Sequence, residues 1–164
     1  MKKQREERCD FYMKAEIYLS LIRKLDVLIS NEQLELENIL TLATKTTQDN
    51  DGMPHAPGTS DKVGNLSVKL LMKEQEINHI IDVFVDLKEE IKAQIRTLPT
   101  DECDVLYKYY VLNQKLFDIA DEREQSVDWI KKLKWRGISK IKVLQSEAYK
   151  SACALLFSEN SSHF

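Results

Sequence analysis

The sequence predicts an all-α protein, in which a long antiparallel helical hairpin with a coiled-coil-like seam is followed by a compact three-helix unit. Three observations lead to this fold class. The 164 residues include only 4 Gly and 3 Pro, apolar residues recur every three to four positions over long stretches, and a composition of 43% hydrophobic and 31% charged residues is typical of soluble helical chains. A chain of this length is able to build one sizeable core without disulfides or a structural metal.

The first element is a long amphipathic helix expected over residues 10–44. Its apolar stripe includes Ile17, Leu21, Leu25 and Leu28, and no Gly or Pro interrupts it. The pattern breaks over residues 46–60, which hold two of the four Gly and two of the three Pro. This segment is predicted to be a loop.

A second long helix is expected to begin at a cap formed by Thr59 or Ser60 and to continue to Ile95. Its apolar stripe steps alternately by three and four residues, and only Lys73 violates it. Each long helix needs an apolar partner for its stripe, so the two are expected to pair as a hairpin over residues 1–98. The same stripes could instead pair between subunits, and a homodimer through the long helices is expected.

Shorter elements follow Pro99 and form the second predicted domain, residues 99–157, before a flexible tail at 158–164. Thr100 is expected to cap a helix over 101–111, and a turn at 112–114 leads to a helix over 115–123. Ser126 is expected to cap a third helix. Its predicted inner stripe is Ile130, Leu133, Ile138, Ile141 and Leu144. Phe117 is expected in the core, and one or both of Trp129 and Trp135 are expected to pack against the two preceding short helices.

The charge is unevenly distributed along the chain. The formal net charge is −3, yet residues 126–150 contain seven positive and two negative side chains. A basic segment on an otherwise acidic chain indicates an anionic partner.

Residues 106–121 resemble the start of a sigma-70 region-4-like helix-turn-helix, with Asp118-Ile119-Ala120 matching the Glu-Ile-Ala of that family. Together with the segment from Thr59 to Val63 and the long helix after it, the chain is similar over residues 21–144 to small phage and prophage proteins akin to late-transcription regulators of the ArpU and RinA type. The resemblance implies a phage-encoded DNA-binding transcriptional regulator, with double-stranded DNA and host RNA polymerase as partners. The family usually has an apolar residue, a Gly and another apolar residue at the turn, where this chain has Arg123, Glu124 and Gln125, so a reshaped or longer turn is expected.

The third short helix is the predicted recognition helix. Residues near its N-terminus are expected to meet base edges, and later cations are expected to meet phosphates. The predicted base contacts are Ser126, Val127, Asp128 and Lys131, and the predicted phosphate contacts are Lys132, Lys134, Arg136 and Lys140.

Other kinds of chemistry find little support in the sequence. The histidines and cysteines lack metal-ligand spacing, and no phosphate-binding loop or nucleophile motif is present, so neither an enzyme nor a metal or cofactor site is expected. With no signal peptide or apolar span, a cytoplasmic protein of a bacterial host without membrane contact is predicted. Two alternatives stay open: a DNA-packaging protein resembling a small terminase subunit, and a protein-protein adaptor that no longer binds DNA.

Overall fold

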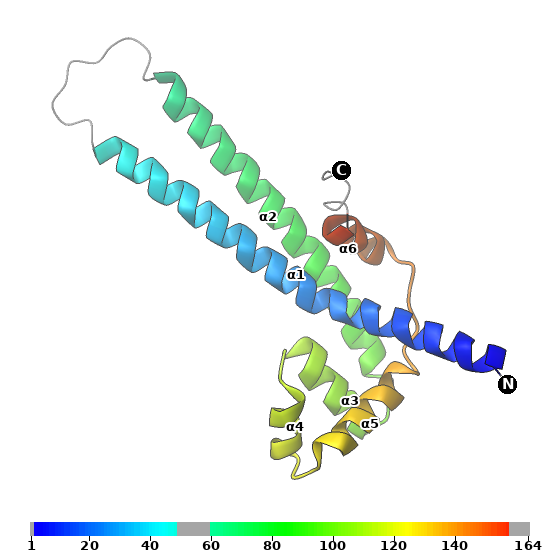
Figure 1. The fold of residues 1–164 in the computed structure, drawn as a ribbon. Helices are drawn as coiled ribbons and strands as arrows, with labels where there is room; N and C mark the ends of the chain where they lie inside the picture. The colour runs from blue at the N-terminus through cyan, green and yellow to red at the C-terminus, as the bar shows by residue number, and fades with distance from the viewer. Residues whose placement is uncertain (1, 49–59, 158–164) are drawn as a thin grey trace. The chain divides into compact units, whose positions relative to one another are not determined.

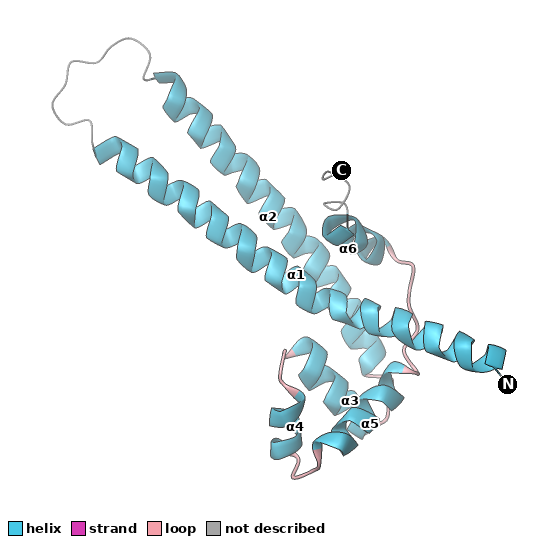
Figure 2. Cartoon of the chain, viewed as in Figure 1, coloured by secondary structure: helices cyan, strands magenta, loops and turns pink. Residues whose placement is uncertain are grey.

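The computed structural model describes the backbone of residues 2–48 and 60–157, and the side chains of residues 14–42, 44 and 65–157. Figure 2 shows that every regular element in this part of the chain is helical, which confirms the predicted all-α class. The predicted loop lies mostly at 49–59, outside the described residues, as does the predicted tail at 158–164. None of the helices described is long and apolar enough to cross a membrane.

Two long helices come first along the chain and shorter ones follow (Figure 1). The second long helix ends at Ile95 as predicted, whereas the first is longer than the predicted 10–44 at both ends. The elements are α1 (Lys2–Gln48), α2 (Ser60–Ile95), α3 (Thr100–Leu106), a π-helical turn η1 (Tyr107–Val111), α4 (Leu116–Glu122), α5 (Val127–Ile138) and α6 (Glu147–Phe157).

The chain divides into two compact units. The first unit joins Met1–Asp26 to Val83–Phe164, and the second unit is Val27–Asp82. Each long helix therefore contributes one part to each unit. The domain boundary predicted at residue 98 stays a prediction.

In the second unit, Lys73 is the centre of an ion-pair cluster that joins α1 to α2. Its ammonium pairs with Glu32 and lies 2.8 Å from Glu35 Oε2 in α1 and 3.4 Å from Glu76 Oε2 in α2. Hydrogen bonds from Lys73 to Glu32 and Glu35 raise the pKa of its ammonium above the ordinary value. The residue that interrupts the apolar stripe of α2 thus has a polar partner on the facing helix, an arrangement that fixes register in paired helices.

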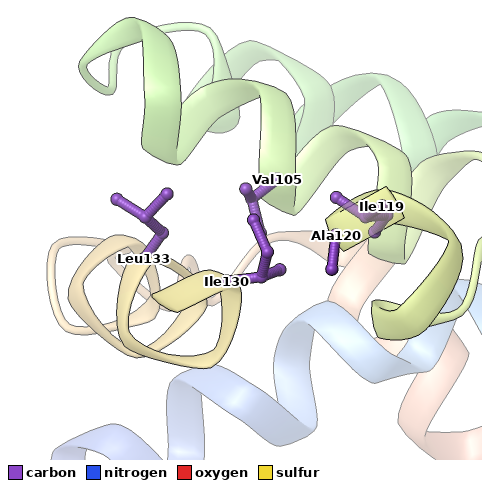
Figure 3. Packing of buried hydrophobic residues seen from close by; sticks show 5 residues of the cluster. All are labelled: Val105, Ile119, Ala120, Ile130 and Leu133. Carbon is purple, nitrogen blue, oxygen red and sulfur yellow. The ribbon is translucent and has the colours of Figure 1, made fainter. Parts of the chain in front are cut away.

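The first unit contains a hydrophobic core to which α3, α4 and α5 contribute. One buried cluster consists of Val105 from α3, Ile119 and Ala120 from α4, and Ile130 and Leu133 from α5 (Figure 3). Only 3% of Ala120 is exposed, so this small residue lies within the packed cluster. The core fixes which face of α5 points inward.

A polar network in the same unit joins α1, α2 and the segment after α5. The Tyr18 hydroxyl donates to Glu90, and Gln94 Nε2 donates to the same hydroxyl at 3.0 Å. Gln94 Oε1 accepts a hydrogen bond from the backbone N–H of Lys142 at 3.0 Å. Burial, reinforced by the hydrogen bond to Glu90, raises the pKa of Tyr18 well above its ordinary value.

Several helix ends differ from the sequence prediction. Pro99 occupies the N-cap position of α3, without a side-chain hydrogen bond, so Thr100 is the first helical residue and not the cap. The third short helix ends at Ile138, and Leu144, which was expected on its inner stripe, is 43% exposed. Residues 141–146, which have no regular secondary structure, then lead into α6, a separate helix that was not predicted.

Candidate nucleic-acid interface on α5

The candidate site is the outward face of α5, which begins as predicted at Ser126. The Ser126 side chain accepts a hydrogen bond from the backbone N–H of Trp129 at 3.2 Å, and its backbone is extended with φ −71° and ψ 145°. Asp128 lies in the first turn, where the helix dipole favours negative charge. This local chemistry explains why the helix starts here.

The inward face of α5 is apolar. Ile130, Leu133, Gly137 and Ile138 are buried, and Val127 packs against the core cluster as a partly buried side chain. Val127, one of the four predicted base contacts, is therefore engaged in packing, whereas Ser126, Asp128 and Lys131 are exposed.

Lys134, a predicted phosphate contact, is held inside the protein. Its Nζ lies 3.1 Å from Glu16 Oε1 in α1 and 4.3 Å from the centre of the Tyr109 ring, and only 13% of the side chain is exposed. A second ring, Tyr110, has its centre 5.5 Å from the same ammonium. An ammonium between a carboxylate and aromatic faces is favourably placed, so Lys134 joins α5 to α1 within the first unit.

Lys140 is also engaged by a neighbouring helix. Its Nζ lies 2.7 Å from both carboxylate oxygens of Glu102 in α3. Glu102 is the buried charged residue of the described core, with 7% of its surface exposed. Lys140 therefore neutralises a carboxylate that would otherwise be buried without a counter-charge.

The remaining cations of α5 point outward. Lys131, Lys132 and Arg136 are exposed, and the Lys131 ammonium is 3.4 Å from Asp128 within its own helix. The Arg136 guanidinium stacks over the Trp129 ring at 5.5 Å from the ring centre. Of the five predicted cationic contacts, the structure brings these three together on the outward side.

Three aromatic side chains on α4 and α5 are exposed, which corrects the expectation that aromatic residues here pack in the core. Trp129 is 40% exposed, Trp135 is 50% exposed, and Phe117 on α4 is 70% exposed. They were not predicted as surface residues because large aromatic side chains are on average well buried. The available signal was the position of Trp129 directly before buried Ile130 on the helix.

The turn between α4 and α5 has a regular form. The N–H of Glu124 donates to the carbonyl of Asp121 at 3.1 Å, and the N–H of Gln125 donates to that of Ala120 at 2.9 Å. This pair of bonds is a Schellman motif, whose residue in the left-handed region is usually Gly. Here Glu124 itself adopts φ 53°. The expected reshaping is therefore absent at this position, and a glutamate takes the conformation that favours glycine.

Arg123, beside it, connects the turn to α3. Its guanidinium pairs with Asp104 and Asp101 at 2.5 Å each, and the hydrogen bond to Asp104 raises the pKa of Arg123 above its ordinary value. On the same side of the unit, Lys108 bonds Glu122 at 2.7 Å. These pairs hold α3, η1 and α4 together.

Comparisons of the chain with models of protein families, with curated proteins and with solved structures find no match. The class that the structure defines is therefore an all-helical protein with a solvent-exposed, cationic and aromatic face on α5. Among the described residues, no three His, Cys, Asp or Glu side chains lie together in a way that could hold a metal ion.

Proposed function

We propose that the protein is a phage or prophage DNA-binding regulator of transcription, in which α4 and α5 act as a helix-turn-helix and α5 enters the major groove. The observation that carries this proposal is the division of α5 into two faces. The inner face packs on the core of α3 and α4, while the outer face presents Lys131, Lys132 and Arg136 to solvent. A groove-binding helix requires this division.

The turn chemistry supports the same proposal. A Schellman turn with a left-handed residue at Glu124 separates α4 from the capped start of α5, as the sequence resemblance implies for a sigma-70 region-4-like motif. Host RNA polymerase as a second partner, and the cytoplasm of a bacterial host as the location, rest on that resemblance.

Salt dependence of DNA binding is the test. Each neutralised phosphate contributes a slope of roughly −0.9 to log K against log salt. If Lys131, although first assigned to base edges, neutralises a phosphate as Lys132 and Arg136 do, the slope is about −2.7, or a roughly fortyfold loss of affinity between 50 and 200 mM salt. The measurement is fluorescence anisotropy with a labelled mixed-sequence duplex at several salt concentrations. Binding that does not depend on salt, or no binding at low salt, would refute the proposal.

A double substitution, Lys131→Ala with Lys132→Ala, is expected to reduce the slope to about −0.9. The matched control is Lys150→Ala on α6, which removes an exposed cation that pairs with Glu147 and lies outside α5. The control is expected to bind nearly as the wild type does. An equal loss in both variants would mean that overall charge, and not the α5 face, determines binding.

We further propose that the long helices mediate a homodimer. The second unit has apolar side chains that are more than half exposed, including Val27 and Leu34 on α1 and Val68, Leu71 and Met72 on α2. Burying such side chains against a second copy would stabilise the pair by on the order of 1 kcal/mol each. Multi-angle light scattering is expected to give a dimer that Leu71→Glu with Met72→Glu converts to a monomer. A monomeric wild type would refute the homodimer, and eight or more subunits would instead favour the packaging alternative.

A further inference from the structure

Trp129 is an exposed aromatic residue at the end of α5 where a recognition helix meets bases. It is the third helical residue, its backbone N–H is bonded to the Ser126 cap, and 40% of its surface is exposed. N-terminal residues of a major-groove helix contact base edges. In the proposed DNA complex, the Trp129 ring would therefore lie where side chains contact base edges.

The ring is also held in place before any partner arrives. The Arg136 guanidinium stacks over it from two turns further along α5, at 5.5 Å from the ring centre. Because a side chain already restrained in the free protein loses less conformational entropy on binding, a stacked indole is a better contact than a freely rotating one. Arg136 thus acts as a positioning residue for Trp129.

The exposed indole is the apolar group that the start of α5 offers to DNA, since Val127 packs against the core and Asp128 carries a charge. In the major groove, guanine, cytosine and adenine present polar acceptors or donors, whereas thymine also presents a methyl group. Apolar side chains contact that methyl group. The Trp129 ring therefore complements thymine.

We propose that Trp129 is a specificity-determining residue that packs its exposed ring against a thymine methyl group in the major groove. This inference rests on the proposed function, because it requires α5 to dock in duplex DNA. Trp and Arg are also enriched in protein-protein hot spots. The flanking Lys131 and Lys132, both exposed, favour the polyanion as the occupant of this face.

The experiment combines a change in the DNA with a change in the protein. Binding is measured at low salt to two duplexes of alternating sequence, one of A and T and one of A and U, which differ only by the thymine methyl groups. Burying one methyl group is worth about 0.8 kcal/mol, so the wild type is expected to bind the thymine duplex about fourfold more tightly. Trp129→Ala is expected to bring this ratio to one, while the matched control Trp135→Ala retains it.

Fluorescence gives a second readout that does not depend on the Trp129→Ala variant folding. The chain has 2 Trp, both on α5, so Trp135→Phe leaves Trp129 as the single fluorophore. Its emission is expected to change when the A and T duplex is added, and to change less with the A and U duplex.

The possible outcomes separate this inference from the proposed function. If the wild type binds DNA in a salt-dependent way but the thymine-to-uracil ratio is one, or if the ratio survives in Trp129→Ala, the role of Trp129 is wrong while DNA binding stands. If the wild type binds neither duplex at low salt, the proposed function itself fails. The same face would then be assigned to a protein partner.

Discussion

Replacing Glu124 by glycine is expected to stabilise the protein, because this residue has φ 53° in the turn between α4 and α5. The left-handed region disfavours a residue with a Cβ by roughly 1–2 kcal/mol. Glycine removes that penalty, but its greater freedom in the unfolded chain offsets about 0.4–1 kcal/mol. The net gain in the free energy of unfolding is therefore about 0.5–1 kcal/mol, or roughly 1–4 °C in Tm for a chain of this size.

The assay is chemical denaturation followed by circular dichroism at 222 nm, with the wild type beside Glu124→Gly and Glu124→Ala. The alanine variant removes the same carboxylate but keeps a Cβ in the strained conformation. It is thus the matched control for charge. Asn113 gives an internal comparison, since it has φ 58° and asparagine tolerates this region better than most residues. Asn113→Gly should stabilise the protein by less than Glu124→Gly.

A Glu124→Gly variant no more stable than Glu124→Ala would show that the left-handed backbone of this residue carries no penalty. An equal gain in both variants would mean that the carboxylate, through repulsion from its acidic neighbours, accounts for the effect. The two hydrogen bonds of the Schellman turn, from Glu124 and Gln125 to α4, do not involve either side chain. They should therefore persist in both variants, and the comparison isolates the backbone conformation.

Three further perturbations test other contacts. Lys73→Glu should destabilise the protein by about 2 kcal/mol, because it places a further carboxylate beside Glu32. Adding Glu32→Lys should restore much of this loss in a double-mutant cycle measured by thermal unfolding. No recovery would argue against the pairing of the two residues. Lys140→Ala should lower the free energy of unfolding by about 1–2 kcal/mol, and Glu102→Gln in the same chain should recover part of it, because no buried charge then remains. The pKa of Tyr18 is raised in the folded protein, so the stability that its neutral phenol contributes is complete below the ordinary pKa of 10.0 and is lost as pH rises above it. Urea titrations at pH 8 and pH 11 should therefore show a smaller difference in the free energy of unfolding between wild type and Tyr18→Phe at the higher pH. The same difference at both pH values would contradict the burial of this phenol.

The sequence predicts the local elements well because their signals are local. Helical spacing, the Ser126 cap and the turn at 112–114 each depend on a few neighbouring residues, and the structure confirms that helices end and begin close to these points. Ends set by tertiary contacts were missed. Thr100 has the chemistry of a cap, yet Pro99 takes that position, and nothing in the pattern marked the irregular segment before α6.

The roles of individual side chains were harder to predict, because they depend on partners far away in the chain. Lys73 was visible only as an exception to an apolar stripe, and its partner Glu32 lies on another helix. Packing of Trp129 in the core was expected because aromatic residues are usually buried, yet the cluster that α3, α4 and α5 bury consists of smaller aliphatic residues and Trp129 is 40% exposed. The spacing of apolar residues predicts which face of a helix is buried, but it does not predict what the exposed face binds.

Some cations in and just after α5 pair within the protein, which lowers the salt dependence of DNA binding expected from the charge of this segment. Counted from the sequence, Lys131, Lys132, Lys134, Arg136 and Lys140 would give a salt slope of about −4.5 if each met a phosphate. Lys134 is held inside the protein by Glu16, and the half-exposed Lys140, two residues after α5, pairs with Glu102. The three other cations leave a slope of about −2.7. A measured slope near the larger value would require those two ion pairs to open on binding. A slope near the smaller value would mean that α5 binds DNA in the orientation these ion pairs fix.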